Sequence, residues 1–188
     1  MTFSRPTLRA LQVSDSISLS NWLANPKLAA AMNIAPQQYT PDAMARYILS
    51  FDERVRVARA VVSGSSQAII GILTVTIDER HKLAVYNLMV AEPGEAKEAV
   101  IITATMAAFD WLFDEMRVEK IATRISAHRE GLAALMEKLG MRREGVLKGE
   151  VLSTDGTTRL DQLAHGLLAV DWPQIRSGTV EELKRMGF

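Results

Sequence analysis

The hydrophobic pattern of the chain changes character once near its middle. Residues 83–90 form a short apolar run rich in β-branched and aromatic side chains, which is typical of a buried strand. Pro93 and Gly94 interrupt the run, and residues 99–116 then carry apolar side chains at helical spacing. The pattern predicts a strand, a tight loop and a long buried helix. Free N–H groups in the first turn of such a helix face the end of the strand and form a site suited to phosphate.

Shorter elements are predicted on both sides of this unit from alternation, helix caps and turn residues. We expect further strands at residues 7–13, 55–63, 68–77, 120–127, 146–152 and 157–168. We expect further helices from Ser14-Asp15 to Asn25-Pro26, at residues 28–32, from Thr40-Pro41 onward, at residues 131–139, and as a tail at about 179–186 that opens with the capping box Thr179-x-x-Glu182.

The order of these elements predicts the fold class. The long helix lies between two strands, so a right-handed crossover places residues 120–127 parallel to residues 83–90. Hairpin signals join the other consecutive strands. We therefore expect an α/β (α+β) fold, with a central mixed, mostly antiparallel sheet of about seven strands and helices on both faces. A single domain over residues 1–188 is expected, with a core at about 7–172.

The amino-acid composition excludes several classes of function but does not identify one. Lys plus Arg equals Asp plus Glu at 22 each, which gives no electrostatic drive toward nucleic acid or an anionic membrane. Cysteine is absent, which excludes disulfides, zinc–thiolate sites and a cysteine nucleophile. No His/Asp/Glu spacing is typical of a metal site, and no G-x-S-x-G nucleophile motif occurs. A cytoplasmic protein without a metal, a nucleic-acid partner or a membrane partner is expected, and a homodimer is compatible with the sequence.

Two segments resemble the GCN5-related N-acetyltransferases (GNAT), especially the ribosomal-protein-alanine acetyltransferase branch. The segment VAEPGEAKEA is similar to the acyl-CoA loop of that family, R/Q-x-x-G-x-G/A, and MEKLGMRREGVLKGEV is similar to its EKLGF-x-x-EG segment. With a final Asp-Trp, the similarity covers roughly residues 7–172. The loop pattern is matched by Gly94, Ala96, Glu98 and Ala99, whereas Ala91 stands where Arg or Gln is usual.

The resemblance implies acetyl-CoA as co-substrate and an amine acceptor that attacks the thioester directly. Loop amides from about Glu92 to Lys97 would hold the coenzyme diphosphate, and a strand N–H at a splay between two parallel strands would polarise the thioester carbonyl. The coenzyme-binding residues implied in this way are Leu88, Met89, Val90, Gly94, Glu95, Ala96, Lys97 and Arg129.

The catalytic residues are matched less well. The family's Asn-x-x-Ser and Tyr positions fall here on Arg129, Leu132 and Met136, so no hydroxyl remains there. His128 is the nearest titratable substitute. Arg129 is a candidate for gripping a coenzyme phosphate. Catalytic candidates near the loop are Glu92 and Tyr86, with Asp78, Glu79 or a backbone-held water as further candidates for the base.

The loop also supports two rival readings. The loop carries three acids around the expected phosphate pocket, Glu92, Glu95 and Glu98, and a single basic residue, Lys97. Pro93 has no N–H group to donate to a phosphate. A diverged, non-catalytic binding module is one alternative, and an acyltransferase that uses a longer acyl-CoA or an acyl carrier protein is the other. The acceptor stays open between a protein N-terminus, an antibiotic, a polyamine and a metabolite amine.

Overall fold

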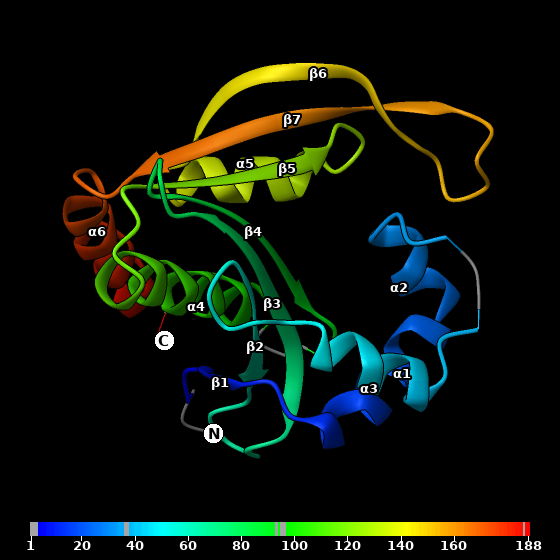
Figure 1. Cartoon of the computed structure of the whole chain (residues 1–188). Coiled ribbons are helices and arrows are strands. Elements are labelled where there is room, and N and C mark those ends of the chain that lie inside the picture. The colour runs from blue at the N-terminus through cyan, green and yellow to red at the C-terminus, as the bar shows by residue number, and fades with distance from the viewer. Residues whose placement is uncertain (1–3, 36–37, 93, 95–96, 186) are drawn as a thin grey trace.

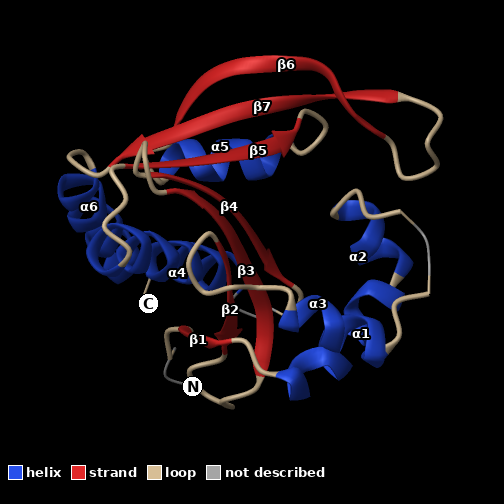
Figure 2. Ribbon diagram, in the orientation of Figure 1, coloured by secondary structure: helices blue, strands red, loops and turns tan. Residues whose placement is uncertain are grey.

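One sheet organises the molecule. The computed structural model describes residues 4–35, 38–92, 94, 97–185 and 187–188. Within these residues the sheet has seven strands in the order β1-β2-β3-β4-β5-β7-β6 (Figures 1 and 2). Every neighbouring pair is antiparallel except β4 and β5, which are parallel. This confirms the predicted mixed sheet and its single crossover.

The elements follow the predicted order. The strands are β1 (Thr7–Ala10), β2 (Arg56–Val62), β3 (Ile69–Asp78), β4 (Leu83–Val90), β5 (Lys120–Ser126), β6 (Arg142–Leu152) and β7 (Arg159–Leu168). The helices are α1 (Ser16–Ala24), α2 (Pro26–Ala31), α3 (Pro41–Leu49), α4 (Lys97–Asp110), α5 (Glu130–Lys138) and α6 (Trp172–Arg185). A 3₁₀ turn, η1 (Val13–Asp15), precedes α1, and a π-helical turn, η2 (Trp111–Glu115), continues α4. No helix of the described residues is long and apolar enough to cross a membrane.

The two faces of the sheet carry different helices (Figure 1). On one face, Phe109 of α4 packs edge-on against Tyr86 of β4, with ring centroids 5.4 Å apart, and against Trp172 of α6 at 5.2 Å. On the other face, Met89 of β4 packs with a smaller cluster from α1 and α3, made of Leu19, Trp22, Met44 and Ile48. Alternation along β4 sends Tyr86 and Met89 to opposite faces, so this strand is buried on both sides.

Local signals fixed several element ends correctly. The Thr40 side chain accepts a hydrogen bond from the N–H of Ala43, and Pro41 occupies the first turn of α3. Strand β4 has the predicted bounds. Gly140 follows α5 with a φ of 84°, the left-handed conformation that favours glycine after a helix.

The predicted start of the last helix was wrong. Helix α6 begins at Trp172, and Thr179 lies inside it, where its hydroxyl donates to the carbonyl of Ile175 at 3.0 Å. Trp172 and Leu183 are almost fully buried in the main core, so apolar burial extends the helix over seven residues before the capping-box motif. Asp15 occupies the N-cap position of α1 as expected, but its side chain does not bond to the helix, because the carboxylate accepts two hydrogen bonds from Arg9 at 2.8 Å each.

Candidate active site

The parallel strands β4 and β5 separate along their length. Among the described residues, they pair only where residues 83–85 meet residues 120–122. Beyond that point β4 stays paired with β3 as far as Val90 opposite Gly71, whereas β5 stays paired with β7 as far as Ser126 opposite Gln162. The sheet therefore opens between the carboxyl ends of β4 and β5, as the resemblance implied.

Gly71 lets the end of β4 lie close to β3. A Cβ atom at this position would lie 2.2 Å from the carbonyl oxygen of Met89, far inside contact distance. Any side chain there would push the two strands apart. The sequence carried a signal for this residue, because a single glycine interrupts the otherwise β-branched run IIGILTVTID.

The backbone of β4 directs amides into the splay. The N–H of Ala91 donates to the carbonyl of Ile70 at 2.8 Å, so odd-numbered residues of β4 turn their N–H groups toward β3. Even-numbered residues then face β5, in agreement with the hydrogen bond from the Lys120 N–H to the Lys82 carbonyl at 3.2 Å. By this alternation Leu88 and Val90 point their N–H groups into the splay, while Met89 contributes its side chain.

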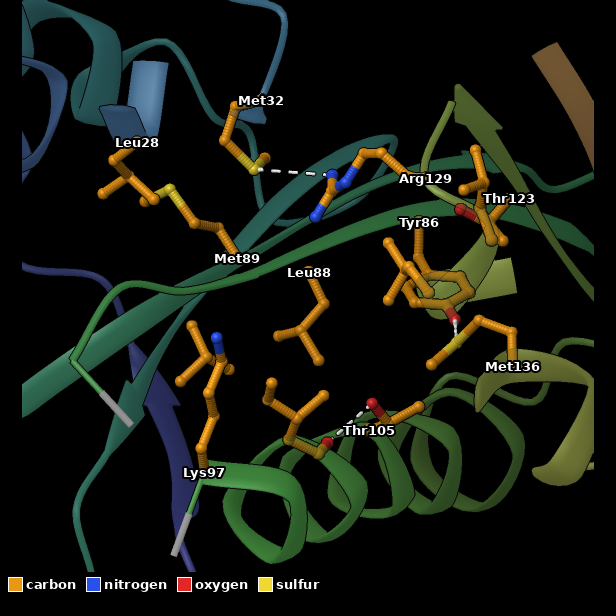
Figure 3. Close-up of a pocket in the computed structure, with 14 residues that line it drawn as sticks. Leu28, Met32, Tyr86, Leu88, Met89, Lys97, Thr105, Thr123, Arg129 and Met136 are labelled. Atoms are coloured by element: carbon orange, nitrogen blue, oxygen red, sulfur yellow. Dashed lines mark hydrogen bonds between the residues drawn. The ribbon is translucent and has the colours of Figure 1, made fainter. Parts of the chain in front are cut away.

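A cavity of about 220 Å³ occupies the splay. Helices from both faces of the sheet reach it, with α4 and α5 on one side and α2 on the other (Figure 3). It is lined by Leu28, Met32, Tyr86, Leu88, Met89, Val90, Lys97, Ile101, Thr105, Thr123, Ile125, Arg129, Leu132 and Met136. Two molecules that approach from opposite faces of the sheet would meet in this cavity. The contributions of Leu28, Met32, Thr105 and Thr123 were not predicted, since no local motif marks them.

Two cations border the cavity, and no carboxylate does among the described residues that line it. Lys97 is exposed at the start of α4, where the helix dipole adds positive potential. Arg129 is half-buried between β5 and α5, and burial lowers the pKa of its guanidinium. Figure 3 shows the two side chains at different ends of the cavity, with Arg129 directed toward Met32 of the α2 segment. The site is therefore suited to anions.

The acidic residues of the loop are turned in different directions. Oε1 of Glu92 accepts a hydrogen bond from Nε1 of Trp22 on α1 at 2.6 Å, which orients this carboxylate toward the α1 side. Glu98 lies with Lys138 at the separate groove between α4 and α5. Two of the three loop acids are thus accounted for, and the third, Glu95, lies outside the described residues.

The loop backbone corrects one expectation. The N–H of Glu92 donates to the Ile70 carbonyl at 3.1 Å, so this amide is not free to bind the diphosphate. Gly94 adopts a φ of 67°, and among the described residues no atom lies within 4 Å of where its Cβ would be, so there is open space beside its Cα. Ala96, like Glu95, lies outside the described residues.

Tyr86 lines the cavity from within the core. It is 2% exposed, and its hydroxyl donates to Sδ of Met136 at 3.2 Å. The Tyr86 hydroxyl therefore lies beside Met136, the residue that stands at the family's Tyr position in sequence. Burial strongly raises the pKa of this phenol, so Tyr86 keeps its proton and is unsuited to act as a base.

The remaining predicted catalytic residues, His128 and Glu92, are not among the residues that line the cavity. His128 is exposed in the turn after β5 and does not line the cavity, whereas its neighbour Arg129 does. Glu92 follows β4 and faces α1. Of the predicted residues, Lys97, Arg129 and the end of β4 therefore line one cavity, and His128 does not.

The family model that describes the acetyltransferase (GNAT) domain matches residues 5–142 of the chain. The chain belongs to the GNAT acetyltransferase family. Its fold and its general activity, N-acetyl transfer with a coenzyme A thioester as donor, are those that the loop and the EKLG segment predicted. A search of curated protein sequences found no match.

Solved structures of N-acetyltransferases share the fold of this GNAT domain. Spermidine N-acetyltransferase from Vibrio cholerae, in complex with CoA and spermine, superposes with a TM-score of 0.79 at 20% identity, covering 89% of this chain and 98% of that one. Ribosomal-protein-S5-alanine acetyltransferase from Vibrio fischeri superposes with a TM-score of 0.76 at 18% identity, covering 92% and 97%.

Proposed function

We propose that this GNAT domain transfers an acetyl group from acetyl-CoA to a primary amine by direct attack at the splay between β4 and β5. The observation that supports this proposal above others is the cavity that helices line from both faces of the sheet. A thioester entering from the α4 side and an amine entering from the α2 side would meet beside the N–H groups of Leu88 and Val90. Bringing two reactants together in this way supplies much of a rate enhancement.

The donor side fits the charge of coenzyme A. Lys97 is the first residue of α4, where amides and the helix dipole favour a diphosphate, and Gly94, three residues earlier, has open space beside its Cα. The Trp22 hydrogen bond turns the Glu92 carboxylate toward α1. At about 4 Å from a phosphate, that carboxylate would cost about 1 kcal/mol in water and about 4 kcal/mol near a protein surface.

The chemical step uses few protein groups. The neutral amine attacks the thioester carbon, a C–N bond forms, and negative charge develops on the carbonyl oxygen, which the N–H of Leu88 or Val90 stabilises. The C–S bond then breaks and the thiolate leaves. Glu92 does not line the cavity, but Trp22 fixes its carboxylate on the face of the sheet that carries α1 and α2, and we assign it as the group that accepts the proton of the amine through a water molecule.

Thiol release tests the proposal directly. The purified chain is incubated with acetyl-CoA and a panel of amines that includes peptides, polyamines, amino sugars and amino acids. We expect thiol release that depends on both substrates, together with acetyl-CoA binding in calorimetry. Absence of release across the panel, with no coenzyme binding, contradicts the proposal.

A second candidate is a GNAT domain that binds acyl-CoA without turnover. It is favoured by α5, which presents Leu132 and Met136 to the cavity in place of hydroxyl groups. A ligand at 100 times its dissociation constant stabilises a protein by about 2.7 kcal/mol. An upward shift of the melting temperature with acetyl-CoA, without thiol release from any amine, selects this candidate.

A further inference from the structure

Arg129 holds a charge that no acid of the described residues neutralises. Its guanidinium is half-buried at the cavity, and its described side-chain contact is a weak one, from Nη1 to Sδ of Met32 at 4.0 Å. Burial has already lowered the pKa of this group. A partly desolvated guanidinium gains most from a carboxylate or phosphate, which it binds through two parallel hydrogen bonds. The side chain is therefore suited to bind an anionic ligand.

The position of Arg129 indicates which substrate supplies the anion. Its guanidinium reaches toward the α2 segment, whereas Lys97 stands on α4, at the end of the cavity proposed for the diphosphate (Figure 3). Around Arg129 the lining on that side is apolar, from Leu28, Met32 and Met89. An anion bound here belongs with the acceptor more naturally than with the distant phosphates of the donor.

We propose that Arg129 binds the carboxylate of the acceptor, and that the acceptor is a free α-amino acid with an apolar side chain. This inference rests on the proposed acetyltransferase function. With its carboxylate on Arg129, such a molecule directs its α-amine toward the splay and lays its side chain against the Leu28, Met32 and Met89 surface. A polyamine brings only positive charge to the same guanidinium, and a protein N-terminus has no carboxylate at this distance from its amine.

Steady-state kinetics with four amines separate these classes. Leucine carries all the proposed features, leucinamide lacks the carboxylate charge, isoamylamine lacks the whole carboxyl group, and spermidine is a polycation. We expect the wild-type protein to show a kcat/KM for leucine about 10- to 100-fold above the values for the other three amines. This is the gain in binding that hydrogen bonds between charged groups typically provide.

Variants of Arg129 test whether the anion that it binds belongs to the acceptor or to the coenzyme. R129Q should raise the KM for leucine to the value for leucinamide, and it should leave the KM values for leucinamide and for acetyl-CoA unchanged. R129K should give a KM for leucine between those of the wild-type protein and R129Q. The matched control is R124Q on β5, because Arg124 is exposed and pairs with Glu150 at 2.9 Å, away from the cavity lining. R124Q should retain the wild-type preference for leucine. Melting temperatures of all variants establish that each is folded.

The outcomes that overturn the inference differ from those that overturn the function. Equal kcat/KM for leucine and leucinamide refutes the acceptor class while the acetyltransferase function stands. A rise in the KM for acetyl-CoA in R129Q, with that for leucine unchanged, assigns Arg129 to a coenzyme phosphate and refutes the inference. Absence of thiol release with every amine refutes the function itself.

Discussion

Trp22 donates its indole N–H to a carboxylate oxygen of Glu92 across 2.6 Å. The two residues are 70 positions apart in sequence, and the bond joins α1 to the segment that follows β4. Trp22 itself is buried in the cluster on the α1 face, so its donor is held in place. Through this bond a helix on one face of the sheet sets the direction of an acid beside the coenzyme loop.

Removal of this donor should weaken coenzyme binding. Trp22→Phe keeps an aromatic ring in the cluster but frees Glu92 to turn toward the coenzyme phosphates, and repulsion of about 1 kcal/mol or more corresponds to at least a fivefold higher Kd for acetyl-CoA. Calorimetry measures this without requiring turnover. Adding Glu92→Gln to the same chain should restore the affinity. An unchanged Kd in Trp22→Phe would show that the bond has no such role.

Lys97 should contribute to the same affinity with a salt dependence. Lys97→Gln removes a positive charge beside the proposed diphosphate site, and we expect a several-fold higher Kd for acetyl-CoA at low salt that converges with the wild-type value at high salt. Lys184→Gln is the matched control, because Lys184 lies on α6 and pairs with Glu181 at 2.8 Å. Equal effects of the two substitutions would argue against a diphosphate at α4.

Tyr86→Phe should change stability slightly and turnover hardly at all. The substitution keeps the ring against Phe109 and removes only the hydroxyl that donates to Met136. We expect a loss of about 1 kcal/mol or less in the free energy of unfolding. We expect kcat within threefold of wild type, because the hydroxyl is buried in the core and already donates to Met136. A fall in kcat of tenfold or more, in a variant with normal melting behaviour, would restore Tyr86 as the proton donor to the thiolate.

Asp15 should make stability depend on acid pH. Burial raises the pKa of this carboxyl, but hydrogen bonds from Arg9 and from the N–H of Gln12 outweigh it, so its pKa in the folded state lies below the ordinary value. The stabilisation is therefore present above the unfolded pKa of about 3.9 and is lost as pH falls through the lower folded value.

Denaturant unfolding of Asp15→Asn measures this contribution. At pH 7 we expect the variant to be less stable by about 1.5–3 kcal/mol, and the difference from wild type should shrink below about pH 4. Arg9→Gln in the Asp15→Asn background should add little, since the pair is already broken. A difference that stays constant down to pH 2 would exclude ionisation of Asp15 as its source.

Structural elements that depend on neighbouring residues could be predicted from the sequence. The apolar run of β4, the loop at Gly94 and the helical periodicity of α4 lie within about thirty residues, and each follows from backbone preference and burial. The start of α6 was not readable. The capping box at Thr179 is a genuine local preference, but burial of Trp172 against Phe109 overrides it.

The residues of the candidate site also fall into those that the sequence predicted and those that it did not. Leu88, Val90, Lys97 and Arg129 were found because they adjoin the loop or a recognisable segment, and all of them line the cavity. Met32 was not found, because it meets Arg129 across 97 residues of chain. His128 was placed in the site by its neighbourhood in sequence, although its side chain lies in an exposed turn.

By itself the sequence determined the order of strands and helices, the parallel crossover and the family. These depend on periodicity and on short motifs, which act between neighbours along the chain. Only the tertiary structure decided where the charges of the site point. Glu92 turns to Trp22 and Arg129 turns to Met32, and a side chain takes its direction from whichever partner packing brings beside it, however distant that partner is in sequence.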